Sequence, residues 1–127
     1  MTFAAFIAVG IGAALGAWAR WGLAALLNAT FPLLPLGTLA ANIIGGLGIG
    51  IAIEIFTRHM ELADELRLFV ITGFLGALTT FSTFSAEIVG LLARANYGWA
   101  LILAAAHLAG SLIATIGGIF LVRWMSA

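Results

Sequence analysis

Long uncharged stretches constrain this chain more than any other feature. Residues 21–53 and residues 95–122 contain no Asp, Glu, Lys or Arg, whereas about 20 apolar residues in a helix are enough to cross the hydrocarbon of a bilayer. Hydrophobic residues make up 64% of the chain and the mean hydropathy is +1.22. These values exclude an ordinary soluble domain. They predict an all-α membrane protein, because a helix in lipid satisfies its own backbone hydrogen bonds.

The length of 127 residues accommodates four such helices and no fifth. We expect a single four-helix transmembrane domain that covers residues 1–127. The predicted spans lie at about residues 3–27, 36–57, 67–92 and 96–124.

Composition also excludes several classes of function. Five basic and five acidic residues balance to a net charge of zero, so there is no basic patch for nucleic acid. Cysteine is absent, which removes disulfides and thiolate chemistry. No nucleophile–base pair or metal-ligating cluster supports catalysis. We therefore do not expect an enzyme.

Small residues recur at intervals of four on the first two spans. Gly12 and Gly16 precede Arg20 at this spacing, and Gly46 and Gly50 follow Asn42 in the same way. Glycine stripes let helix backbones approach closely in lipid. The stripes fit packing inside one subunit and packing between subunits equally well.

The five arginines give almost no orientation signal. With four spans, Arg58, Arg67 and Arg123 lie on the face of the termini, and Arg20 and Arg94 lie toward the other face. Orientation follows the Lys and Arg bias between the two faces, and three against two is nearly even. The chain is therefore expected to insert in both directions. Two opposite copies would pair about a two-fold axis in the membrane plane, as inverted repeats do in transporters.

The stretch "GFLGALTTFSTFSAE", residues 73–87, brings glycines and hydroxyl side chains into the third span. Glycine and threonine are both weak helix formers, so a break near residues 76–80 is plausible. Carbonyls freed at membrane depth require protein, water or an ion as a partner, and a cation is one candidate. An unbroken helix, with hydroxyls bonded to carbonyls one turn back, fits the pattern as well.

Polar side chains recur on three of the spans at helical spacing. On the third span, Phe81, Phe84 and Ser85 share one face, and aromatic rings carry a positive edge. Such pairs are more often core, and membrane Ser and Thr mostly join helices. Asn42 and His107 are costlier to bury and are the stronger functional candidates. The stripes on the second and fourth spans consist of Thr38 and Asn42, and of His107, Ser111 and Thr115.

Four motifs resemble the CrcB/Fluc family of fluoride channels in order and spacing. They are "GAWARWG" at 16–22, "GTLAANIIGG" at 37–46, "GFLGALTTFSTFSAE" at 73–87 and "HLAGS" at 107–111. The resemblance covers essentially the whole chain, and the third motif is long and specific. It implies an antiparallel, dual-topology homodimer with two fluoride pores and a buried structural Na+ at the dimer interface.

The resemblance also implies roles for individual residues. The sodium ligands would be the backbone carbonyls of Gly76 and Thr79 from each subunit. The ring edges of Phe81 and Phe84 would meet fluoride, and Asn42 would donate a hydrogen bond. The expected pathway also includes Thr38, Ser82, Thr83, Ser85, His107 and Ser111, with Arg20 and Glu87 at the vestibules. This sequence departs from the family pattern at Ala77, where a second glycine is common, and at His107, where a smaller polar residue can occur.

Residue chemistry and resemblance lead to one expected function, which is passive fluoride export that relieves toxicity across a bacterial inner membrane. Fluoride is small and strongly hydrated, so a selective passage needs close neutral donors that hold it weakly. Two alternatives stay open. A small four-helix multidrug exporter would need a carboxylate in the first helix, and residues 1–27 contain none. A non-transporting membrane assembly subunit would need only the glycine stripes.

Overall fold

The computed structural model describes residues 2–127, which form helices joined by short connections. Four helical segments are long and apolar enough to cross a membrane, as the sequence predicts. The first, second and fourth spans are single helices, and the third is divided into four consecutive pieces. In chain order the elements are α1 (Phe3–Leu27), η1 (Asn28–Thr30), α2 (Leu36–Arg58), α3 (Asp64–Arg67), η2 (Leu68–Leu75), α4 (Gly76–Leu78), α5 (Phe81–Ala93) and α6 (Tyr97–Met125).

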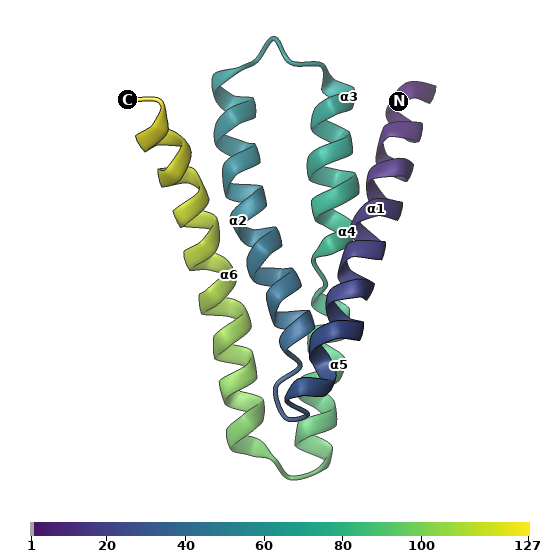
Figure 1. Ribbon diagram of the computed structural model, residues 1–127, viewed down its shortest axis with the longest axis vertical. Coiled ribbons are helices and arrows are strands. Elements are labelled where there is room, and N and C mark those ends of the chain that lie inside the picture. The colour runs from purple at the N-terminus through teal and green to yellow at the C-terminus, as the bar shows by residue number, and fades with distance from the viewer. Residues whose placement is uncertain (1) are drawn as a thin grey trace.

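The chain runs up and down, and both termini lie at the same end as the connection between α2 and α3 (Figure 1). This arrangement agrees with the expected division of the arginines. Within the bundle, α1 packs mainly along η2 and α4, and α2 packs mainly along α6. The two pairs diverge toward the end that carries the termini and meet at the other end (Figure 1).

Glycines bring α1 against the third span inside the chain. A Cβ on Gly12 would clash with the carbonyl oxygen of Phe69, and one on Gly16 would clash with the carbonyl oxygen of Phe74. Both glycines are buried. Helix backbones approach this closely only where the side chain is a hydrogen atom. The stripe of α1 therefore serves packing within one subunit.

The same device joins α2 to α6. A Cβ on Gly46 would lie 2.8 Å from the carbonyl oxygen of Ser111, and one on Gly50 would clash with the carbonyl oxygen of Thr115. Both α2 glycines are buried. The stripe that starts at Asn42 thus also packs inside the chain. This close packing also brings the side chain of Asn42 next to α6.

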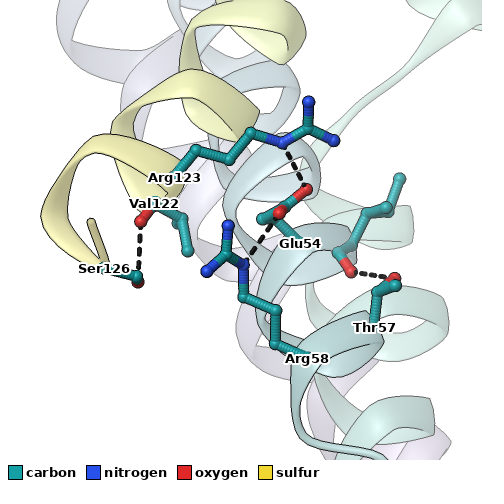
Figure 2. A network of polar contacts seen from close by, with 7 residues as sticks. Glu54, Thr57, Arg58, Val122, Arg123 and Ser126 are labelled. Atoms are coloured by element: carbon teal, nitrogen blue, oxygen red, sulfur yellow. Dashed lines mark hydrogen bonds and ion pairs between the residues drawn. The ribbon is translucent and has the colours of Figure 1, made fainter.

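An ion network fastens α2 to α6 at the end that carries the termini (Figure 2). Oε1 of Glu54 accepts a hydrogen bond from Nε of Arg58 at 2.8 Å, and its Oε2 lies 3.1 Å from Nε of Arg123. Glu54 is 8% exposed. Each carboxylate oxygen has a guanidinium partner, so the buried charge is paired.

Candidate functional site

The third span is broken at Thr79 and Thr80. Helix α4 ends at Leu78, both threonines have extended backbone angles (φ −80°, ψ 151° and φ −149°, ψ 117°), and α5 begins at Phe81. The break falls within the predicted residues, and the alternative of an unbroken helix is wrong. Upstream of the break, η2 is a π-helix over eight residues, which the sequence analysis did not predict. Such wide turns are rare and occur frequently at functional sites.

Asn42 of α2 holds the broken backbone. Its Oδ1 accepts a hydrogen bond from the backbone N–H of Thr80 at 2.7 Å. Its Nδ2 donates to the carbonyl oxygen of Thr80 at 3.1 Å and lies 2.9 Å from Nδ1 of His107 on α6. One amide side chain thus replaces the helical hydrogen bonds of Thr80 and links three spans. Backbone groups at membrane depth need such protein partners.

The break also leaves several carbonyls without their helical donors, those of Gly76 and Thr79 among them. In a continuous helix the N–H of Thr80 would bond to the carbonyl of Gly76, and the N–H of Thr83 to that of Thr79. Here the first N–H donates to Asn42, and the second donates to the Thr80 hydroxyl at 3.1 Å. The two carbonyls named as cation ligands by the resemblance have therefore both lost their helical donors. Carbonyl oxygens of this kind are good ligands for a hard cation.

Arg20 of α1 reaches the same break. Its Nε donates to the carbonyl oxygen of Ala77 at 3.0 Å, and the residue is half-buried. The sequence predicts Arg20 at a vestibule but carries no signal for this bond. The guanidinium therefore satisfies another carbonyl that the break exposes.

A groove of about 440 Å³ lies beside the break, between α2, α6 and the third span. Asn42, Thr79, Phe81, Phe84, His107 and Ser111 are among the residues that line it. Phe81 is 74% exposed in the single chain, whereas Phe84 is only 6% exposed. Their rings meet edge to face, with centroids 5.4 Å apart. The groove therefore combines neutral polar groups with the positive edges of aromatic rings.

The ring of His107 packs against Phe84, with centroids 4.6 Å apart. His107 is only 3% exposed, and its Nε2 has no hydrogen-bond partner among residues 2–127. A buried polar atom without a partner costs free energy and calls for a physical explanation.

Two predicted residues form a pair away from the groove lining. The hydroxyl of Thr38 donates to Oε1 of Glu87 at 2.6 Å, and Oε2 of Glu87 is buried without a partner in the described part of the chain. Asn28, which the sequence analysis did not consider, accepts from the N–H groups of Gly37 and Thr38 at 2.8 and 3.1 Å. Asn28 therefore caps the first turn of α2 from outside it. An Asn eight residues before the helix carries no local capping signal.

The remaining predicted residues differ in their surroundings. The hydroxyl of Ser82 lies 3.2 Å from that of Thr80, and the hydroxyl of Thr80 donates to that of Thr83 at 3.0 Å. These contacts stabilise the first turn of α5. Ser85 makes no side-chain hydrogen bond within the described residues. The groove is lined by Gly76 and Thr79 and by five residues of the predicted pathway, namely Asn42, Phe81, Phe84, His107 and Ser111. The other predicted residues are not among its lining residues; they are Thr38, Ser82, Thr83, Ser85, Arg20 and Glu87.

The site can bind ions through neutral groups. Within residues 2–127 there is no group of three or more His, Cys, Asp or Glu residues able to hold a metal ion. Freed carbonyls offer oxygen to a cation, and N–H groups and ring edges offer positive dipoles to an anion. Weak, multiple contacts of this kind suit an ion that must also leave.

Comparison with known proteins points to one family throughout the chain. The family described as CrcB-like protein, Camphor Resistance (CrcB), matches residues 7–119. A fluoride-specific ion channel FluC of Nitrosospira multiformis is 58% identical over 96% of this chain and 95% of its own length. Proteins of the same name from Thiobacillus denitrificans and Cupriavidus necator are 55% and 54% identical, each over 95% of this chain and 98% and 96% of their own lengths. These matches show that the chain belongs to the CrcB-like family.

Proposed function

We propose that this protein is a fluoride-selective ion channel that exports fluoride passively across a bacterial inner membrane and so relieves fluoride toxicity. The relatives named fluoride-specific ion channels match almost the whole chain at 52–58% identity. The observation that carries the proposal is the groove beside the helix break, where Asn42, Phe81, Phe84 and His107 come together without a carboxylate. A narrow lining of neutral donors selects a small, strongly hydrated anion better than a ring of charges would.

Fluoride in this proposal passes the edges of Phe81 and Phe84 and the amide of Asn42. The ring of Phe81 and the ring of Phe84 line the same groove, the first exposed and the second buried. Positive ring edges replace part of the hydration shell without binding the anion tightly. Thr38, Ser82, Thr83, Ser85 and Ser111 extend the polar track, and Arg20 and Glu87 serve its vestibules.

A structural sodium ion fits the freed carbonyls of Gly76 and Thr79. Both carbonyls have lost their helical donors to side chains, and backbone oxygens suit a hard monovalent cation. Each chain would contribute these two oxygens, so a second copy related by a two-fold axis would complete a set of four. Bound there, the ion would supply a fixed positive charge near the proposed anion path. The carbonyls depend on the backbone bend that Asn42 holds.

The second copy is proposed to insert in the opposite orientation, giving an antiparallel homodimer. The near-even division of the arginines supports dual insertion, and the 74% exposed ring of Phe81 at the groove leaves room for a partner. Two lysines added after Ser126 should bias the chain to one orientation and lower flux, because antiparallel pairs become scarce. C-terminal reporter fusions that show a single orientation in the unaltered protein would contradict dual insertion.

Ion flux from purified protein in liposomes tests the function directly. Fluoride efflux should be fast, with chloride efflux at background and no transport of a lipophilic cation. Transport of the lipophilic cation coupled to protons would instead indicate a multidrug exporter. Absence of all three fluxes from folded protein in the membrane would leave a non-transporting assembly subunit as the better description.

A further inference from the structure

A second groove, of about 340 Å³, lies between α2 and α6 at the end that carries the termini. Apolar side chains line most of it, namely Ile51, Ile55, Leu121, Val122 and Met125. Gly50 and Gly118 are the last glycines of the two helices toward this end, and a Cβ on either would clash with the backbone of the facing helix. Beyond these glycines the larger side chains hold the helices further apart, and the groove opens.

The outer end of this groove is basic. Arg58 and His59 are among its lining residues. The 23 residues of α2 extend about 34 Å at about 1.5 Å per residue, slightly more than the hydrocarbon thickness of about 30 Å. Arg58, the last residue of the helix, therefore reaches the level of the lipid phosphates. The groove thus runs from apolar side chains in the hydrocarbon to a guanidinium group among the head groups.

The ion network beside the groove leaves one positive charge over. The single carboxylate of Glu54 meets two guanidinium groups, those of Arg58 and Arg123, so the carboxylate is paired but the network is not neutral. Both arginines bond to it through Nε (Figure 2), and their Nη atoms make no hydrogen bond within residues 2–127. A pair of Nη atoms matches the oxygens of a phosphate. The carboxylate of Glu61, in the connection after α2, is paired with His59 and does not line the groove.

We propose that this groove binds one phospholipid whose head group carries a single negative charge. The phosphate lies on the Nη atoms of Arg58, and an acyl chain lies along Ile51 and Ile55. A head group of charge −1 balances the positive charge that the network leaves over, whereas a zwitterionic head group does not. Basic pockets between membrane helices bind anionic head groups for this reason. The inference does not depend on the fluoride function.

Trp124 provides a local readout of the bound lipid. It is 79% exposed and lies next to Arg123 on α6, whereas Trp18, Trp21 and Trp99 lie toward the other end of the bundle. Replacing these three by Phe leaves a single fluorophore, which bromine atoms on a neighbouring acyl chain quench. Bilayers that mix phosphatidylglycerol with phosphatidylcholine, with one or the other brominated, give the relative binding of the two lipids. We expect a preference for phosphatidylglycerol of about fivefold, the usual effect of one basic residue near the membrane surface.

Two substitutions in the network should change this preference in opposite directions. Arg58→Gln removes the phosphate ligand and leaves the network neutral, so the preference should fall about fivefold. Glu54→Gln raises the excess to two positive charges, so the preference should rise by a similar factor. Both variants break the contact between Glu54 and Arg58. A merely structural response would therefore change the preference in the same direction in both, and that result would overturn the inference.

A larger side chain in the groove separates a lipid site from attraction to the charged surface. Ile55→Phe fills part of the groove without changing any charge, so the preference for phosphatidylglycerol should fall. Ile53→Phe is the matched control, because Ile53 is exposed on the same helix and does not line the groove. Equal preferences in the two variants would mean that the groove holds no lipid.

Other occupants give different results. Inorganic phosphate at millimolar concentration should not displace the brominated phosphatidylglycerol, and displacement would assign the arginines to free phosphate. The chain has no cysteine, so cross-linking of Ile55→Cys between two copies in the membrane would assign the groove to a subunit interface.

Native mass spectrometry of the unaltered protein repeats the lipid comparison without replacing any tryptophan. Phosphatidylglycerol should stay bound in preference to phosphatidylcholine, and equal retention of the two lipids would contradict the proposal. None of these measurements uses fluoride flux. A protein that binds the lipid but conducts no fluoride would therefore defeat only the proposed function.

Discussion

Two polar networks join α2 to α6, and they differ in how completely their groups are paired. Near the end that carries the termini, Glu54 meets Arg58 and Arg123, and each carboxylate oxygen has a partner (Figure 2). At the level of the break, Asn42 and His107 are neutral and leave an Nε2 unpaired among the described residues. The first network is complete within the chain, and the second is not.

The difference reflects the free-energy cost of burying polar groups at the ends of the spans and near their middle. Burying a full charge in a membrane protein costs much free energy in the middle of a span, because water is remote there. The arginine network lies where guanidinium groups can reach the aqueous boundary. The neutral network lies along the helix break, and its one unpaired atom, Nε2 of His107, has no hydrogen-bond partner among residues 2–127. Unsatisfied groups at such a position are a reason to assign function there.

Asn42→Ala should produce the largest effect. It leaves the N–H and the carbonyl of Thr80 without their side-chain partners, at about 1–3 kcal/mol for each buried group, and it releases His107. Fluoride flux from liposomes should fall to background. Asn42→Asp should be at least as severe, because a carboxylate opposes the Thr80 carbonyl and repels an anion.

Thr57→Ala is the matched control on the same helix. The Thr57 hydroxyl donates only to the carbonyl of Ile53 and is exposed, so stability and flux should be unchanged. Near-normal fluoride flux from well-folded Asn42→Ala protein would show that the neutral network is structural only.

Phe81→Ile and Phe84→Ile should rank next. Each removes a positive ring edge and keeps an apolar side chain, so flux should fall sharply in protein that is still folded. The effects on stability should differ, because Phe84 is 6% exposed and Phe81 is 74% exposed. Thermal unfolding should show a loss of about 1–3 kcal/mol for Phe84→Ile and a smaller one for Phe81→Ile. If both rings serve only as packing, flux per folded protein will stay near the unaltered rate.

Glu54→Gln should have a smaller effect, on stability and not on transport. The amide leaves the two guanidinium groups of Arg58 and Arg123 without a countercharge, so the melting temperature should fall. Flux per folded protein should be little changed, since no groove residue is touched. Glu61→Gln, in the exposed connection after α2, is the control and should melt like the unaltered protein. A large loss of flux in folded Glu54→Gln would erase the distinction between the two networks.

Thr79→Ala should have the smallest effect. The substitution removes a hydroxyl that donates to the carbonyl of Leu75 at 2.9 Å, and it leaves the carbonyl of Thr79 in place. The proposed sodium ion should therefore remain, which a high-resolution structure of the variant dimer can show. Loss of the ion in a folded Thr79→Ala dimer would mean that the hydroxyl, and not the backbone carbonyl, is the ligand.

Several features of the fold were predictable from local properties of the chain. The four spans follow from uncharged stretches such as residues 21–53, because hydropathy adds up along a helix whatever its neighbours are. The break at Thr79 and Thr80 lies among weak helix formers, but the sequence pattern fitted an unbroken helix equally well. The stripe from Gly12 to Gly16 announced close helix contact, although its spacing did not say which helix would be the partner.

Other features depend on groups that are distant in sequence. The π-helix at Leu68–Leu75 has no periodic signature, and it packs against α1. Asn28 caps α2 from eight residues away, and Thr38 meets Glu87 across 49 positions. The sequence shows that such residues are polar and costly to bury. It does not identify their partners.

The sequence by itself determined that this chain spans a membrane with four helices and that the third span has weak helix formers near its middle. It also determined that Asn42 and His107 are costly to bury and are therefore candidates for a functional role. Only the tertiary structure decided that Asn42 hydrogen-bonds to both backbone groups of Thr80 and lies 2.9 Å from Nδ1 of His107. The physical reason is that burial and helix stability accumulate residue by residue, whereas a hydrogen bond forms only when two atoms on different helices come within about 3 Å of each other.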